Sequence, residues 1–279
     1  MQTASIDIGI AHATSSEYSV SRWEQGKALT LSDHVAEEVP VALVYNGISH
    51  AVMLATPQDL EDFALGFSLT EGIAGSPQDI YEIEVTPQSN GIELHITLAT
   101  EKFHMLKLRR RSMTGRTGCG LCGAESLEQA MRIPVNTMPV NEQISAKSLE
   151  KAIHLINERQ QLQQLTGGTH ACAWVSNEGD IQLIREDVGR HNALDKLIGA
   201  IANSKTNTSG FVLTSSRASY EMVQKTASAS IPILVAMSAP TGLAIRVARN
   251  CGMTLIGFAR LHKHVIYSYP ERIVHEEVK

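Results

Sequence analysis

The chain lacks long apolar runs and an excess of positive charge. Its longest apolar runs, such as residues 231–237, are far shorter than the roughly 20 residues that a membrane-spanning helix needs. The first residues show no basic start followed by an apolar stretch, which is the pattern of a secretory signal. The formal net charge of -5 argues against binding to nucleic acid or to an anionic membrane. We therefore expect a cytoplasmic protein that neither inserts into membranes nor binds nucleic acid.

Cysteine is also scarce, with four in 279 residues. Cytoplasmic thiols are normally reduced, so a close pair such as Cys119 and Cys122 is more typical of a metal, redox or catalytic site than of a structural disulfide. Cys172 and Cys251 lie in apolar stretches, where a free cysteine behaves as a small hydrophobic residue. We expect these two thiols to be buried and inert.

The remaining composition, with 43% apolar and 19% charged residues, is ordinary for a globular protein. Residues 1–25 are polar and aperiodic, and we expect them to be loosely ordered. Residues 26–112 predict a smaller α+β domain, because they contain a hairpin signal at Asn46-Gly47, an amphipathic helix and two further strands. Residues 113–126 hold the cysteine pair among several glycines, and we expect a mobile CxxC loop there.

Residues 127–279 alternate between amphipathic helices and continuous apolar strands, in the order α-β-β-α-β-α-β-α-β. This pattern predicts an α/β domain whose sheet is covered on both faces and is mostly parallel after its first hairpin. The layout is similar to the cytidine deaminase fold, a three-layer α/β/α domain that holds zinc through a histidine and two cysteines at two helix starts. The equivalent helix starts here, residues 215–219 and 238–242, contain neither residue type. We therefore expect a deaminase-like domain without catalytic zinc or deaminase activity.

Four loops are predicted to meet at the carboxyl edge of this sheet, where the ligands of such folds bind. They are residues 186–192, 214–219, 237–242 and 258–263. Hydroxyls, cations and the free backbone N–H groups of helix starts together suit a phosphate group. The side chains concerned are Arg190, His191, Ser216, Arg217, Ser219, Thr241, Arg260, His262 and Lys263. Plain helix capping is the alternative for the hydroxyls. Asp187 and Asp195 are either acceptors for a guanine or pterin edge or members of salt bridges within the fold.

The cysteine pair follows a basic stretch with no acidic residue between Glu101 and Glu125. On charge alone this stretch is typical of a solvated helix face. A structural zinc site would need a second pair of ligands, which the isolated remaining cysteines do not supply. A thioredoxin-like dithiol would follow a strand, whereas this pair follows a basic, aperiodic stretch. A sulfur carrier needs an exposed, mobile thiol with a lowered pKa, which the glycines and arginines favour. The residues favour the carrier and leave zinc binding and redox chemistry open.

Six motifs together closely resemble the FdhD family of formate dehydrogenase accessory sulfurtransferases. They are "RTGCGLCGAES" (116–126), "GGTHACAW" (167–174), "REDVGRHNALDKLIG" (185–199), "SSRASYEMVQK" (215–225), "APTGLAI" (239–245) and "GFAR" with "IYSYPERI" (257–260 and 266–273). The resemblance runs from about residue 30 to 275 with matching order and spacing. It implies a homodimeric sulfur carrier with a deaminase-like main domain.

The resemblance also implies partners and site residues. The carrier accepts sulfur from a cysteine desulfurase and passes it to the molybdenum or tungsten bis-molybdopterin guanine dinucleotide cofactor, which then enters formate dehydrogenase. The persulfide cysteine corresponds to Cys119 and the second thiol to Cys122. The cofactor-binding stretch corresponds to Phe258, Ala259, Arg260, Leu261, His262 and Lys263. Here Leu261 and His262 stand in place of a glycine-containing turn, which leaves the backbone, Arg260 and Lys263 as the expected contacts. The alternative is a cofactor-binding chaperone whose cysteine pair is a redox or zinc site without sulfur transfer.

Overall fold

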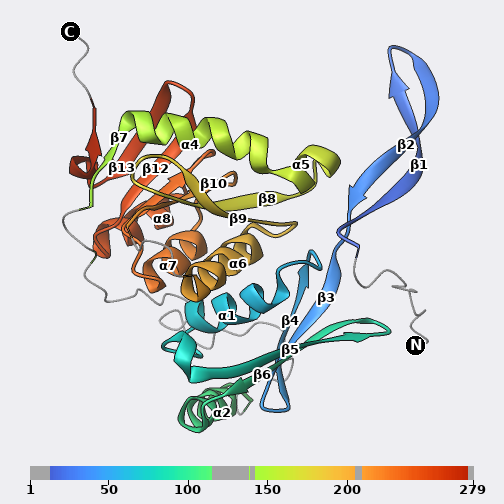
Figure 1. The fold of residues 1–279 in the computed structure, drawn as a ribbon, viewed down its shortest axis with the longest axis vertical. Coiled ribbons are helices and arrows are strands. Elements are labelled where there is room, and N and C mark those ends of the chain that lie inside the picture. Colours follow the sequence, from blue (N-terminus) through green and yellow to red (C-terminus); the bar gives the residue numbers. More distant parts are fainter. Residues whose placement is uncertain (1–12, 115–137, 139–141, 205–208, 276–279) are drawn as a thin grey trace.

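Residues 13–114, 138, 142–204 and 209–275 are described by the computed structural model (Figure 1). They form a smaller and a larger domain, each built from helices and sheet, which confirms the predicted two-domain α/β architecture. The predicted CxxC loop lies outside the described residues from Gly115 onward.

The smaller domain is a four-stranded sheet in the order β4-β3-β6-β5, with a helix packed against one face. Its elements are β3 (Val39–Tyr45), β4 (Ile48–Ala55), α1 (Leu60–Thr70), β5 (Ile80–Gln88), β6 (Gly91–Leu98) and α2 (Thr100–Thr114). The predicted hairpin is confirmed, because Asn46 and Gly47 join β3 to β4 with φ angles of 46° and 80°. Leu43, Leu94 and Phe63, from β3, β6 and α1, belong to the core of this domain.

A two-stranded arm precedes this sheet. β1 (Ser15–Glu24) pairs antiparallel with β2 (Lys27–Ala36) around Gln25 and Gly26, both of which have positive φ. The expectation that residues 1–25 are loosely ordered is therefore wrong for β1, and the expected domain boundary falls inside the turn of this arm. Most side chains of the arm are exposed, so the sequence shows little of the apolar contrast that marks a half-buried strand.

Residues 100–114 form helix α2, so the expectation of an aperiodic stretch is wrong there, whereas the alternative of a helix that its charge suggested is confirmed. Leu106 is buried in the core of the smaller domain, and Phe103 packs beside it. At the start of the helix, Lys102 Nζ lies 3.7 Å from Asp79 Oδ2. Among residues 101–108 of α2 only Leu106 is fully buried, and the helix is rich in basic residues, so its sequence carries little apolar periodicity.

The larger domain alternates helices and strands as the sequence predicted. Its elements are β7 (Ile144–Ser145), α4 (Ala146–Arg159), α5 (Gln161–Thr166), β8 (His170–Val175), β9 (Ile181–Asp187), α6 (Arg190–Asn203), β10 (Phe211–Thr214), α7 (Tyr220–Ser228), β11 (Ile233–Ala236), α8 (Gly242–Asn250), β12 (Thr254–Arg260), β13 (Lys263–Ser268) and β14 (Ile273–Val274). A break at Gln160 divides the first predicted helix into α4 and α5. The short pair β7 and β14 was not predicted.

The six-stranded sheet of this domain has the order β13-β12-β11-β10-β8-β9. After the first hairpin, β8–β9, the sheet is mostly parallel as expected, because β10–β11 and β11–β12 pair in parallel. Short hairpin connections make β8–β9 and β12–β13 antiparallel, and β8 is also antiparallel to β10. Because β8 runs against both of its neighbours, the carboxyl ends of β9, β10, β11 and β12 still lie at one edge, and the amino end of β8 joins them there.

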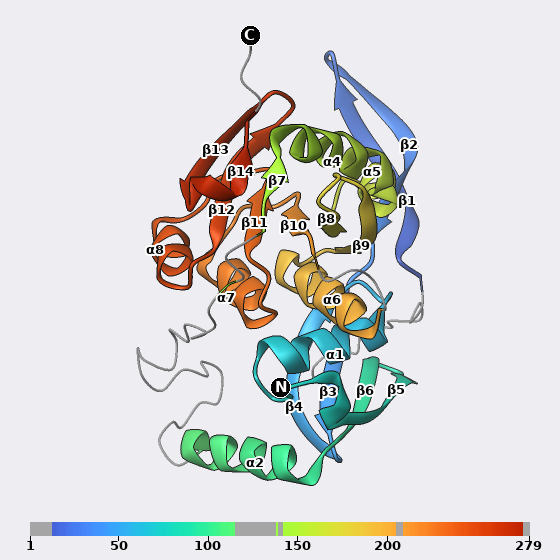
Figure 2. The same cartoon turned by 60° about the vertical axis from the view of Figure 1, so that its left-hand side comes forward.

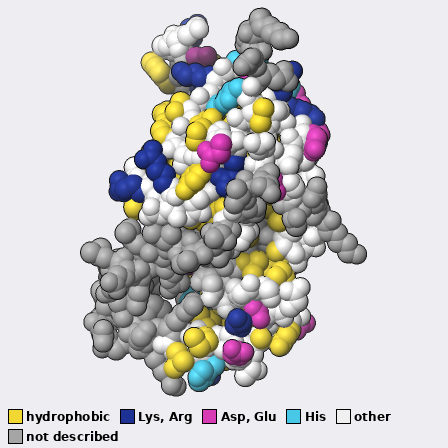
Figure 3. Space-filling model, turned by 90° about the vertical axis from the view of Figure 1, so that its left-hand side faces the viewer, with side chains coloured by type: hydrophobic (Ala, Val, Ile, Leu, Met, Phe, Trp, Pro, Cys, Tyr) yellow, Lys and Arg dark blue, Asp and Glu magenta, His cyan; other side chains and the backbone are white. Residues whose placement is uncertain are grey.

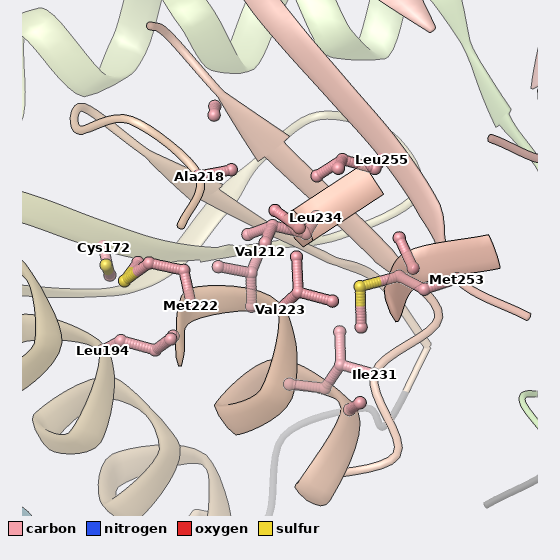
Figure 4. Packing of buried hydrophobic residues seen from close by; sticks show 14 of the residues in the cluster. Cys172, Leu194, Val212, Ala218, Met222, Val223, Ile231, Leu234, Met253 and Leu255 are labelled. Atoms are coloured by element: carbon pink, nitrogen blue, oxygen red, sulfur yellow. The ribbon is translucent and has the colours of Figure 1, made fainter. Parts of the chain in front are cut away.

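The sheet is the middle of three layers, with α4 and α5 on one face and α6, α7 and α8 on the other (Figures 1 and 2). Alternate strand residues point to opposite faces. Val212 of β10 packs with α6, α7 and α8, whereas its neighbours Phe211 and Leu213 pack with α4. Figure 4 shows part of the first cluster, in which Met222 and Val223 of α7 meet the strand residues Val212 and Leu234. Burial on both faces explains the continuous apolar strands.

The two domains are joined where α1 crosses α6. Gly66 of α1 lies against the backbone of Asp195, so that a Cβ at Gly66 would stand 1.7 Å from the Asp195 carbonyl oxygen. Gly199 of α6 lies against Asp62 in the same way, at 1.9 Å. A glycine on each helix thus lets the two backbones approach more closely than any side chain would permit.

Buried ion pairs flank this crossing. Lys196 Nζ is 2.7 Å from Asp187 Oδ2, and both side chains are fully buried. Lys225 Nζ is 3.0 Å from Asp195 Oδ2 and 2.9 Å from Glu71 Oε1, which belongs to the smaller domain. A buried charge without its partner destabilises the fold. Separating the domains would leave these charged groups exposed or without their partners.

Charge on the described surface is mixed in sign. On the face shown in Figure 3, basic and acidic side chains are interspersed with apolar ones, and the visible cations form no single patch. Among the described residues, no helix is long and apolar enough to cross a membrane.

We expect Gly199→Ala to lower the free energy of unfolding by about 1–3 kcal/mol or more, because the added methyl group would overlap the Asp62 carbonyl. Urea unfolding followed by circular dichroism measures this change. Gly242→Ala is the matched control, because a Cβ at that helical position would lie 3.6 Å from its nearest neighbour, the end of the Arg246 side chain. Equal unfolding free energies for the two variants would contradict the tight crossing.

We also expect Lys225→Met to destabilise the protein by about 3–5 kcal/mol at about pH 8, because it leaves the buried Asp195 carboxylate without its lysine. Burial raises the pKa of Asp195 above its unfolded value, and Lys225 opposes that rise. A carboxyl group with a raised folded pKa stabilises the fold when protonated, so the variant should lose stability as pH rises from about 5 to about 8. Urea midpoints across this range test the slope. Adding Asp195→Asn to the variant should remove it.

Candidate functional site

The four loops predicted to meet at the carboxyl edge of the sheet do lie together. Ser238 N donates to Ser216 O at 3.3 Å, which joins the loops after β11 and β10. Phe258 N donates to Ser238 O at 3.0 Å and brings in the end of β12. His191 Nε2 is 3.3 Å from Ser219 Oγ, which brings in the start of α6. We call this edge, formed by residues 186–192, 214–219, 237–242 and 258–263, the rim.

Two arginines give the rim a positive local charge. The Arg190 Nε atom is buried and has no hydrogen-bond partner among the described residues. Burial lowers the pKa of Arg190, and nearby Arg217 lowers it further. Burial and then these two arginines also lower the pKa of His170. Glu221 offsets part of the charge, since its carboxylate lies 2.8 Å from His191 Nε2. A bound anion would supply acceptors to both guanidinium groups and relieve their repulsion.

The rim hydroxyls divide into groups used by the fold and groups left available. Ser216 is buried, and its Oγ lies 3.0 Å from Thr214 Oγ1. Thr241 caps α8 by accepting from Ala244 N at 3.2 Å. Ser219 is the N-cap residue of α7 but makes no side-chain capping bond. Internal bonding and helix capping therefore account for Ser216 and Thr241. The Ser219 hydroxyl does not cap its helix but lies 3.3 Å from His191 Nε2, so a ligand would share it with that ring.

The carboxylates of Asp187 and Asp195 face the interior. Asp187 is 0% exposed and accepts from Thr56 N at 3.0 Å and from Gly189 N at 2.7 Å, in addition to its ion pair. Asp195 is 1% exposed and accepts from Thr70 Oγ1 at 2.7 Å. The expectation that Asp187 contacts a ligand is therefore wrong. The salt-bridge alternative is confirmed for both carboxylates.

The segment Phe258–Lys263 turns from β12 into β13 at the rim. Phe258 and His262 have φ angles of 51° and 60°, in the left-handed region that glycine adopts most easily. The turn expected at this position is therefore formed although residues 261–262 contain no glycine. His262 adopts the left-handed conformation that a glycine would take there. Ala259 is fully buried, so its side chain is unavailable to a ligand. The exposed side chains are those of Phe258, Arg260, Leu261, His262 and Lys263.

A cavity of about 520 Å³ lies beside the rim, at the end of the sheet face that α4 and α5 cover. Its lining residues are Asn157, Gln160, Gln163, Gly167, Gly168, Thr169, His170, Ser215 and Met237. Arg260 Nη1 donates to the carbonyl of Met237, so the cavity adjoins the Phe258–Lys263 segment.

This cavity was not predicted from the sequence. The prediction rested on the carboxyl ends of the strands, whereas the antiparallel β8 brings its amino end, at His170, to the same edge. The run of amides in residues 157–164, followed by "GGTH" at 167–170, was the signal that could have indicated a polar wall.

Both cysteines in the described part of the chain are buried. Burial raises the pKa of Cys172 to about 12 and also raises the pKa of Cys251. The expectation that these thiols are buried is confirmed, and their raised pKa values suit inert groups. Cys119 and Cys122 lie outside the described residues. Within the residues that the structure describes, no group of three or more histidine, cysteine, aspartate or glutamate side chains is placed to hold a metal ion.

Comparison with known proteins agrees with the motifs. A profile of the FdhD/NarQ family matches residues 36–274. The sulfur carrier protein FdhD of Cupriavidus necator is 56% identical over 266 residues, which cover 94% of this chain and 91% of that protein. The protein of the same name from Bordetella petrii is 55% identical over 88% of each chain.

A solved structure shares the fold. It is described as a formate dehydrogenase accessory protein from Desulfotalea psychrophila. It superposes with a TM-score of 0.75 at 25% sequence identity, covering 94% of this chain and all of that one. The profile match over most of the chain, the high identity to named relatives and the shared fold lead to one conclusion: this chain belongs to the FdhD/NarQ family.

Proposed function

We propose that this protein is a sulfur carrier that serves formate dehydrogenase. It takes persulfide sulfur from a cysteine desulfurase onto Cys119 and transfers it to the bis-molybdopterin guanine dinucleotide cofactor, carrying molybdenum or tungsten, before that cofactor enters formate dehydrogenase. The observation that carries the proposal is a cationic rim of four converging loops in a chain 56% identical to a named sulfur carrier.

The loading step needs a thiolate. The Cys119 thiolate attacks the terminal sulfur of the donor persulfide, the donor S–S bond breaks, and the donor cysteine leaves as a thiolate. One S–S bond forms and one breaks, so no external oxidant or reductant is required. The burial of Cys172 and Cys251 supports placing this step on the remaining pair, with Cys122 as the second thiol.

The rim suits the acceptor because the nucleotide halves of the cofactor carry phosphates. Four rim groups would contact these phosphates: the Arg190 guanidinium, whose Nε is unpartnered among the described residues, the exposed side chains of Arg217 and Lys263, and the Ser219 hydroxyl. In the transfer step the outer persulfide sulfur would pass to the bound cofactor, whose metal would supply the two electrons that reduce it to sulfide, and Cys119 would leave as a thiolate. The protein supplies the sulfur and an anion-binding edge that holds the acceptor in place. We also propose that the protein acts as a homodimer, as its resemblance to the family implies.

Loading of Cys119 is tested by incubating the protein with a cysteine desulfurase and cysteine and then measuring its intact mass. We expect a gain of one sulfur atom that reducing agent removes and that Cys119→Ala abolishes. Cys172→Ala is the control, because burial should keep that thiol from reacting.

A gain that persists in Cys119→Ala would refute the assignment to this cysteine. Absence of any gain, together with stoichiometric zinc by elemental analysis, would point to a zinc-structured chaperone without sulfur transfer.

Phosphate binding at the rim is tested by calorimetric titration with GDP. We expect Arg217→Ala and Lys263→Ala each to weaken binding by roughly 10- to 100-fold, as the loss of a hydrogen bond to a charged group predicts. Lys27→Ala is the matched control, because it removes one exposed cation from the tip of the β1–β2 arm. Unchanged affinity in both rim variants would remove the rim as the phosphate site.

A further inference from the structure

Two histidines beside the rim lie against each other and take no part in the proposed function. His264 Nε2 and His275 Nε2 are 3.1 Å apart, and the rings are stacked with 5.2 Å between their centroids. His264 belongs to β13, whereas His275 directly follows β14. The two imidazoles can share one N–H···N hydrogen bond, but the same nitrogens are the atoms through which histidine binds metal ions.

The spacing of the two nitrogens suits a shared metal ion. A bond from Zn²⁺ to a histidine nitrogen is about 2.0–2.1 Å long, and a tetrahedral angle between two such bonds separates the nitrogens by about 3.3 Å. A right angle, as in octahedral or square-planar coordination, reduces that separation to about 2.9 Å. The observed 3.1 Å lies between these values, so the backbone already places both nitrogens at a distance that one ion can bridge.

Both histidines are carried by backbone that the fold holds in place. Ile273 of β14 is buried and pairs with Ile144 of β7, two residues before His275. On the other side, Val265 of β13 pairs with Gly257 of β12, and Ile266 packs against the core that α4 covers. Ligands that are already in position lose little conformational entropy when an ion binds.

The charge around the pair suits a divalent cation. Burial lowers the pKa of His264, His275 lowers it further, and the Glu150 carboxylate of α4 opposes both effects. A lowered pKa favours the neutral imidazole, which is the form that binds a metal. The same carboxylate lies 3.2 Å from His262 Nδ1, so an acidic group stands among the three histidines. His275 is exposed and His264 is half-buried, which leaves the pair open to ions from solvent.

We propose that His264 and His275 bind one divalent transition-metal ion through their Nε2 atoms, with water in its remaining coordination positions. Imidazole suits Zn²⁺, Ni²⁺ and Cu²⁺. In the described part of the chain no group of three or more candidate side chains is placed to hold a metal, so we assign two protein ligands and an exchangeable ion. The bound ion would tie the end of β14 to β13 and secure the C-terminal strand. The inference goes beyond the proposed function, because it uses neither the cysteine pair nor the rim.

The test is calorimetric titration of the EDTA-treated full-length protein with NiCl₂ and with ZnCl₂. Because a close cysteine pair can also bind these ions, the titrations use the Cys119→Ala/Cys122→Ala variant. We expect it to bind one ion per chain and to unfold at a higher temperature when the ion is present. Adding His264→Ala or His275→Ala should weaken binding by at least about 10- to 100-fold, the cost of removing even an outer partner of a metal site. Neither histidine variant should keep the thermal shift.

His154→Ala is the matched control, because this exposed histidine lies beside a carboxylate, with 3.4 Å between its Nδ1 and Glu158 Oε1. It should leave the affinity and the thermal shift unchanged. Absence of binding before any histidine is replaced, or unchanged affinity in both His264→Ala and His275→Ala, would overturn the inference. Either result would leave the sulfur-carrier proposal intact, since that proposal is judged by the mass of the loaded protein. The titration with all histidines present remains decisive even if a histidine variant does not fold.

Discussion

The close crossing of α1 and α6 is the constraint on which the rest of the structure depends. Gly66 and Gly199 let the two helices meet backbone to backbone, and no other residue would fit at either position without moving a helix. The ion pairs Lys196–Asp187 and Lys225–Asp195 then lie buried beside the contact. Because the close approach of the helices excludes water, a charge there that lost its partner would be neither solvated nor paired, and the fold would be destabilised. The two domains therefore depend on each other for stability, although each has its own core.

This crossing also places the rim. Thr56 of the smaller domain donates its N–H to Asp187 and accepts from Val188 N through its hydroxyl, which holds the chain between β9 and α6. Asn192 donates to the carbonyl of Leu54 at 2.8 Å and secures the first turn of α6. Arg190 stands between these anchors. The backbone that carries Arg190 is consequently held at the sheet edge by contacts that extend into the smaller domain, so disturbing the domain interface should also displace this arginine.

Neutral and cationic surfaces meet at this edge for a topological reason. β8 runs antiparallel to β9 and β10, so the amino end of β8 and the helix break at Gln160 lie next to the carboxyl-end loops. The amino end of β8 and the helix break at Gln160 line the cavity, and the carboxyl-end loops carry the arginines. Two kinds of chain connection thus place an uncharged polar cavity next to cationic loops.

The residue pattern by itself determined the alternating elements, the Asn46-Gly47 hairpin, the burial of Cys172 and Cys251 and the family, because periodicity, turn residues and spaced motifs are local properties. It could not show β1, whose exposed faces carry little apolar contrast, nor that β8 pairs with β10. Only the tertiary structure decided that Asp187 and Asp195 are internal ion-pair members and that Gln160 is among the residues that line a cavity. Burial and strand direction arise from packing between distant segments, and no local pattern records which polar side chain that packing leaves unpaired.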